Sequence, residues 1–203
     1  MRKSLAWLLF GGLFIVGCGG SVGPVSVGPA SSSDVSLQSG DLPGGMSKCP
    51  ESGDIESWLN KVKTSAPDSY QTSADQWNKA KQMGATEGHV DIYSEDSSLC
   101  GKGFAGVGAG ANVSKKVAAS EVIKFKDEGS ATKFYKDQVA SGSLQGATTG
   151  NATGLGQNSF SAFITGIGAA AWQKQVFQIG LFTDNLSQAD FTKAAKNMDG
   201  RVH

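Results

Sequence analysis

Three residues of this chain have the types and spacing that chemistry could use: Glu87, His89 and Asp91. In a β-strand, residues two apart point to the same face, so these side chains would share one face and Val90 and Ile92 the other. A histidine flanked by carboxylates can serve as a general base or contribute to a metal site. An ordinary polar strand face explains the same pattern, and the sequence favours that simpler interpretation.

The rest of the sequence offers few partners for such chemistry. His203 is the other histidine and lies at the C-terminus, whereas usual metal sites need three or four convergent ligands. The glycine-rich stretch 101–110 lacks the G-K-[ST] ending of a phosphate-binding loop. We therefore expect no metal, no cofactor and no catalytic residue. A hydrolase that uses His89 as its base is the alternative.

The N-terminal residues have the pattern of a bacterial export signal. Two basic residues precede an apolar run over residues 5–16, which is shorter than the ~20 residues that span a membrane as a helix. Four residues then resemble the lipobox of bacterial lipoproteins: Ile15, Val16, Gly17 and Cys18. The resemblance implies that residues 1–17 are a cleaved signal peptide and that Cys18 carries the lipid. The alternatives are an uncleaved anchor or a signal with an ordinary cleavage site.

The charge balance limits the possible partners. The chain has 18 basic and 18 acidic residues, and two basic residues lie in the signal, so the processed chain keeps 16 basic residues. Its charges are interspersed, without the basic stripe that nucleic-acid binding requires. We expect no nucleic-acid partner, and contact with the membrane through the lipid alone. The lipoprotein resemblance implies a location outside the cytoplasmic membrane, on the cell membrane or the outer membrane.

The cysteines are consistent with this location. With Cys18 assigned to the lipid, Cys49 and Cys100 remain as an even pair in an oxidising compartment, which favours a disulfide. Closing a loop of about 50 residues would stabilise the fold by roughly 4 kcal/mol. A redox or catalytic pair is the alternative, although C-x-x-C spacing is missing.

Composition divides the processed chain into two parts. Residues 18–47 begin with the lipidated cysteine and continue through Gly, Ser, Val and Pro with almost no charge, which predicts a flexible tether. Residues 48–203 have the length of one common domain.

Hydrophobic periodicity predicts an α+β domain. Apolar residues at helical spacing alternate along the chain with segments of period two. The expected class is an antiparallel sheet with helices on one side, preceded by one or two short helices. The predicted helices are 54–63, 73–83, 127–142 and 187–200, and the predicted strands are 87–93, 117–126, 158–164 and 170–182.

The last two strand–helix units align with each other at an offset of 57 residues. The matched pairs are Phe125 with Phe182, Asp127 with Asp184, Ser130 with Ser187, Phe134 with Phe191 and Lys136 with Lys193. This alignment predicts a strand–strand–helix unit used twice. The alternative is that strand-to-helix junctions generally favour Asp, Ser and an inward-pointing Phe.

Aromatic residues are concentrated in the second unit. Trp172, Phe160 and Phe163 would line an apolar ligand pocket if the sheet leaves one beside its helices, although core packing is the usual role of such residues. The Gly-Leu-Gly phrase at 154–156, together with the strand–helix units, is similar to small secreted lipoproteins of actinobacterial type. Their roles are mostly unknown, so the similarity implies no site residues.

These observations favour a lipid-anchored binding or interaction domain outside the cytoplasmic membrane. Its partner would be a small apolar ligand or another envelope protein, and neither is identified by the sequence. One alternative is an envelope hydrolase that uses His89. The other is a structural or assembly factor of the cell envelope, which an exposed apolar patch in place of a pocket would favour.

Overall fold

The computed structural model describes residues 30–101, 114–141 and 147–203. The predicted signal peptide, Cys18 and most of the glycine-rich stretch 101–110 lie outside these residues. Within the described ranges, no helix is both long enough and apolar enough to cross a membrane.

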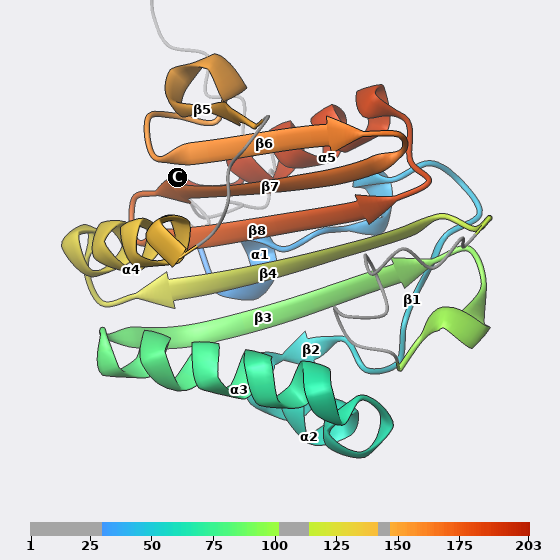
Figure 1. Cartoon of the computed structure of the whole chain (residues 1–203), viewed down its shortest axis with the longest axis horizontal. Helices are drawn as coiled ribbons and strands as arrows, with labels where there is room; N and C mark the ends of the chain where they lie inside the picture. The colour runs from blue at the N-terminus through green and yellow to red at the C-terminus, as the bar shows by residue number, and fades with distance from the viewer. Residues whose placement is uncertain (1–29, 102–113, 142–146) are drawn as a thin grey trace, which may run out of the picture.

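The centre of the fold is one antiparallel sheet of eight strands (Figure 1). Their order is β1-β3-β4-β8-β7-β6-β5, and β2 also pairs with β3. The strands are β1 Ser47–Lys48, β2 Gly53–Asp54, β3 Ala85–Ser94, β4 Val117–Phe125, β5 Thr148–Thr149, β6 Ser159–Ile164, β7 Ile167–Lys174 and β8 Phe177–Asp184. The α-helices are α1 Ser32–Val35, α2 Ile55–Ser65, α3 Pro67–Gln82, α4 Glu128–Ser141 and α5 Gln188–Gly200. Short 3-10 helices are η1 Ser39–Asp41, η2 Ser97–Leu99 and η4 Gly150–Thr153.

Helices cover both faces of this sheet. Ala118 and Val122 of β4 enter a core shared with α1 and α5, which we call the α5 face. Ala119 and Ile123 enter a core shared with α2, α3 and α4, which we call the α3 face. The predicted α+β class with an antiparallel sheet is confirmed, whereas the helices lie on two sides rather than one. The reason is that β4 is apolar in both sets of alternating positions, as strands buried on both faces are.

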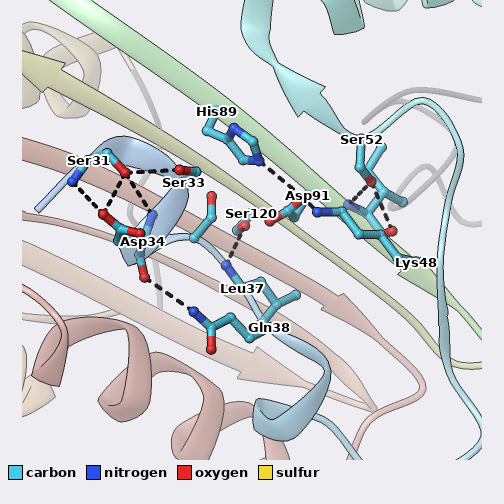
Figure 2. A network of polar contacts seen from close by, with 12 residues as sticks. Ser31, Ser33, Asp34, Leu37, Gln38, Lys48, Ser52, His89, Asp91 and Ser120 are labelled. Atoms are coloured by element: carbon cyan, nitrogen blue, oxygen red, sulfur yellow. Dashed lines mark hydrogen bonds and ion pairs between the residues drawn. The ribbon is translucent and has the colours of Figure 1, made fainter.

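The segment that precedes β1 belongs to the domain. Val35 and Leu37 have no exposed surface, and Leu42 is also buried in the core of the α5 face. The Leu37 N–H donates to Ser120 Oγ of β4 at 3.1 Å (Figure 2). The prediction of a flexible tether up to residue 47 is therefore wrong from residue 30 onward. The composition of this segment is dominated by glycine and serine, which is why it predicts a tether. Its few apolar residues are nevertheless enough to bury the segment against the surface of the sheet.

The last residues of the chain secure this segment. The Arg201 guanidinium donates to Asp41 Oδ1 at 3.0 Å and Oδ2 at 2.8 Å, and also to the Ser36 carbonyl at 2.8 Å. Burial alone would raise the pKa of Asp41. Hydrogen bonds from Arg201 and from the Gln38 N–H outweigh the burial and hold that pKa below its usual value. Both ends of the described chain are thus joined on the α5 face.

The predicted strand 170–182 is in fact a hairpin. β7 and β8 pair with each other, and Gln175 between them adopts a left-handed φ of 51°. Glycine and asparagine are the residues that usually adopt this conformation, and proline is the other common turn residue. This turn uses glutamine instead, so the sequence gives no signal for it.

The two units aligned at an offset of 57 residues do not form equivalent contacts. Phe125 packs on Phe134 of α4, with ring centroids 5.2 Å apart, on the α3 face. Its matched residue Phe182 points to that same face because it pairs with Ala119. The following helix α5 lies on the opposite face, where Phe191 contacts Phe163. The matched positions therefore reflect local strand–helix preferences and not a repeated packing unit.

Candidate functional site

The predicted disulfide is present between Cys49 and Cys100, with Cα atoms 5.5 Å apart. It joins the connection between β1 and β2 to the residue that follows η2. Glu51 is buried beside it and accepts a hydrogen bond from the Gly101 N–H. The two sulfur atoms are bonded to each other, so the cysteines have a structural role in this state.

His89 and Asp91 meet on the α5 face of β3, as their spacing predicts. His89 Nε2 lies 3.4 Å from Asp91 Oδ1, and Lys48 Nζ of β1 lies 2.6 Å from the same oxygen (Figure 2). The Asp91 side chain is only 4% exposed. Glu87 faces other partners: it accepts from the Ser32 N–H at 3.1 Å and lies 3.4 Å from Lys124 Nζ. The trio therefore shares a strand face without converging on one point.

An open groove of about 450 Å³ lies beside His89, between the start of α1 and the edge of β3. Ser31 and Ser33 line it and would be the candidate nucleophiles. The Ser31 hydroxyl bonds Asp34 Oδ2 at 2.7 Å and Ser33 Oγ at 2.9 Å, which is the arrangement of a helix cap (Figure 2). Among the described residues, no serine hydroxyl is hydrogen-bonded to His89. The groove thus has a histidine–aspartate pair but lacks the nucleophile–base contact of a hydrolase.

The three aromatic residues predicted to line a pocket do not share one. Trp172 is completely buried in the core of the α5 face, and Phe163 packs beside Phe191 on that face with ring centroids 5.8 Å apart. Phe160 pairs with Ala171 and points to the α3 face. Residues 160 and 163 differ by an odd number within one strand, so their side chains must point to opposite faces.

On the α3 face, part of the sheet has no helix over it among the described elements. α4 packs at one end of β7 and β8, and no other described helix lies over this face of β6 to β8 (Figure 1). The side chains at this place are apolar or absent, and Ile164 and Ile167 are 64% and 36% exposed. We call these residues the open strip: Phe160, Ala162, Ile164, Ile167, Ala169, Ala171, Gly180 and Phe182.

One carboxyl lies at the inner border of the open strip. Ala171 pairs with Gly180, and Gly180 pairs with Glu121 of β4, so the three residues form one row across the sheet. Gln76 Nε2 of α3 donates to Glu121 Oε2 at 3.3 Å. Burial raises the pKa of Glu121 to about 7. Sequence reasoning missed this residue, although a single glutamate within an apolar strand is itself a signal.

Comparison with known proteins identifies a fold and no family. No family model matches the chain, and neither does any curated protein. A solved structure with a similar fold is the extracellular domain of PknH from Mycobacterium tuberculosis, at a TM-score of 0.50 and 10% sequence identity. The match covers 86% of this chain and 97% of that domain. At this identity the likeness shows the fold alone.

Proposed function

We propose that this chain is a lipid-anchored interaction domain outside the cytoplasmic membrane, and that it binds its partner through the open strip. The observation that carries the proposal is the open strip itself. Ile164 and Ile167 are exposed and the other six residues of the strip are partly exposed, and a continuous apolar surface that reaches solvent marks an interaction site. The eight residues of the strip include no charged side chain, which suits an apolar partner surface or ligand.

Two further observations support the location. The disulfide between Cys49 and Cys100 fits an oxidising compartment. Eleven residues, 19–29, separate the lipobox-like residues 15–18 from Ala30, the first residue described. At full extension, 11 residues reach at most about 40 Å, so the anchor would hold the domain close to the bilayer.

The alternative hydrolase receives less support. His89 has its acidic partner, but Ser31 at the groove is the N-cap of α1, and Asp91 is already paired with Lys48. We expect His89→Ala to leave the biological activity of the protein intact. Loss of that activity in a variant that folds normally would favour the hydrolase instead.

Photo-crosslinking in cells tests the proposed function. A photoreactive amino acid at position 164 should give one discrete crosslinked product, while the same amino acid at the exposed Lys133 of α4 should not. Cys18→Ala should release the protein from the membrane fraction and remove the diacylglycerol mass. Equal crosslinking at both positions, or none at either, would contradict an interaction role for the strip.

A further inference from the structure

We propose that the open strip together with Glu121 binds an amphiphile that has an alkyl chain and a positively charged amine head. The inference deepens the proposed function, because it names the chemical class of the ligand. The amine would bind the Glu121 carboxyl at the inner border of the strip, and the alkyl chain would run from there across Gly180 and Ala171 onto the rest of the strip.

The register of the strands gives the strip its length. Ile164 and Ile167 form one row of the α3 face, Ala162 and Ala169 the next, and Phe160 and Ala171 the third. Neighbouring rows are two residues apart, about 7 Å along a strand, so the three rows span about 14 Å. This length suits an extended alkyl chain of medium size.

Small residues leave the path from the strip to the carboxyl open. Of the described atoms, a methyl group added at Gly180 would meet one within 4 Å, the Glu121 carbonyl oxygen at 3.7 Å. Ala171 continues the row with a single methyl group. Among the described residues, no side chain therefore lies within 4 Å of a methyl group at Gly180, the position between Ala171 and Glu121.

The charges of this region favour a cationic head. Burial is the sole cause of the raised Glu121 pKa, so no charged side chain among the described residues compensates the carboxylate. The nearby lysine on α3, Lys79, pairs with Asp137 of α4 at 3.7 Å. The partner of Glu121 itself is the neutral amide of Gln76. An amine would supply the missing positive charge, whereas an anionic head would be repelled.

Three probes with the same chain and different heads test the inference: decylamine, decanol and decanoate, each below its critical micelle concentration. The protein is the chain from residue 19, exported to an oxidising compartment so that the disulfide forms. Isothermal calorimetry at pH 7.5 should show decylamine binding at least tenfold more tightly than decanol, and decanoate more weakly than both. The decylamine affinity should also rise between pH 6 and pH 8, because the carboxylate ionises in that interval.

Glu121→Gln keeps the size of the side chain and should reduce decylamine to the affinity of decanol, without the pH dependence. Glu128→Gln, an exposed carboxyl on α4, is the matched control and should change neither. Gly180→Val should weaken the binding of all three probes, because its side chain would occupy the space beside Glu121. If Gly180→Val folds poorly, Ala171→Leu blocks the same row of the strip.

Two results would overturn the inference and can be told apart from failure of the proposed function. If all three probes bind equally and Glu121→Gln has no effect, the amine head is refuted while the strip remains a binding surface. If no probe binds while position 164 still crosslinks to a protein, the strip serves a protein partner and the amphiphile is refuted. Failure of the crosslink as well would refute the proposed function.

Discussion

Gly168→Ala tests the packing between the sheet and α5. A Cβ atom at Gly168 would lie 2.5 Å from Phe191 Cδ2 and 2.6 Å from Thr183 Oγ1, both closer than atoms in contact allow. Phe191 is buried and rests on Phe163, so its ring has little room to move. Such overpacking typically costs about 1–3 kcal/mol, and the lower entropy of the unfolded alanine chain offsets about 0.4–1 kcal/mol of it.

The expected net loss is about 1–2 kcal/mol in the free energy of unfolding, which corresponds to a melting temperature lower by about 2–8 °C. Urea denaturation followed by circular dichroism measures it. Gly180→Ala in the neighbouring strand is the matched control, because its Cβ would meet no described atom closer than 3.7 Å. That variant should be stable or slightly stabilised, by about 0.4–1 kcal/mol.

Equal stability of the two variants would refute this account of the packing. A second check uses Phe191→Leu, which shortens the ring that the new methyl group meets. In that background, Gly168→Ala should cost less than it does alone, and the difference is the coupling energy of the pair. Additive losses would indicate that Phe191 is not the obstacle.

Three further predictions concern charges and the covalent link. Replacing Cys49 and Cys100 by serine opens a link with a sequence separation of 51 and should cost about 4 kcal/mol in urea denaturation, a loss that reduction of the native protein should reproduce. Arg201→Gln leaves Asp41 buried without its cation and should lower the free energy of unfolding by about 3 kcal/mol at pH 7. Because the Asp41 pKa is lowered in the native state, the greater stability of the wild type should persist above about pH 4 and disappear as the pH falls further. The pKa of Glu121 is shifted in the opposite direction, from the ordinary 4.5 to about 7. Between these two pH values the native state holds a proton that the unfolded chain has lost. The free energy of unfolding should therefore fall by about 2–3 kcal/mol from pH 4.5 to pH 7, and Glu121→Gln should show no such slope.

Local signals in the sequence predicted several elements well. Ser187 caps α5 by accepting from the Asp190 N–H at 3.1 Å, as the S-x-x-D pattern predicts, and the helix ends at Gly200. The helix predicted at 73–83 begins earlier, at Pro67, since proline suits the first turn of a helix. The disulfide followed from counting cysteines and from the predicted compartment.

What the sequence missed depends on neighbours far along the chain. Leu37 is buried because Ser120, 83 residues later, bonds its N–H. The position of Glu121 beside a residue without a side chain follows only from the pairing of β8 with β4, which places Gly180 next to it. Periodicity within one strand predicts which face each side chain takes, but it does not say which distant strand lies beside it.

The contact between Arg201 and Asp41 has a mechanical consequence. A pulling force applied on the N-terminal side of Ala30 passes through the segment that Leu37 and Leu42 fix to the sheet. Arg201, near the other end of the chain, donates hydrogen bonds to that segment at Asp41 and at the Ser36 carbonyl. The load is therefore shared with α5 before any strand separates from the sheet, so the contact of Arg201 with Asp41 would protect the fold against force applied at the N-terminal side.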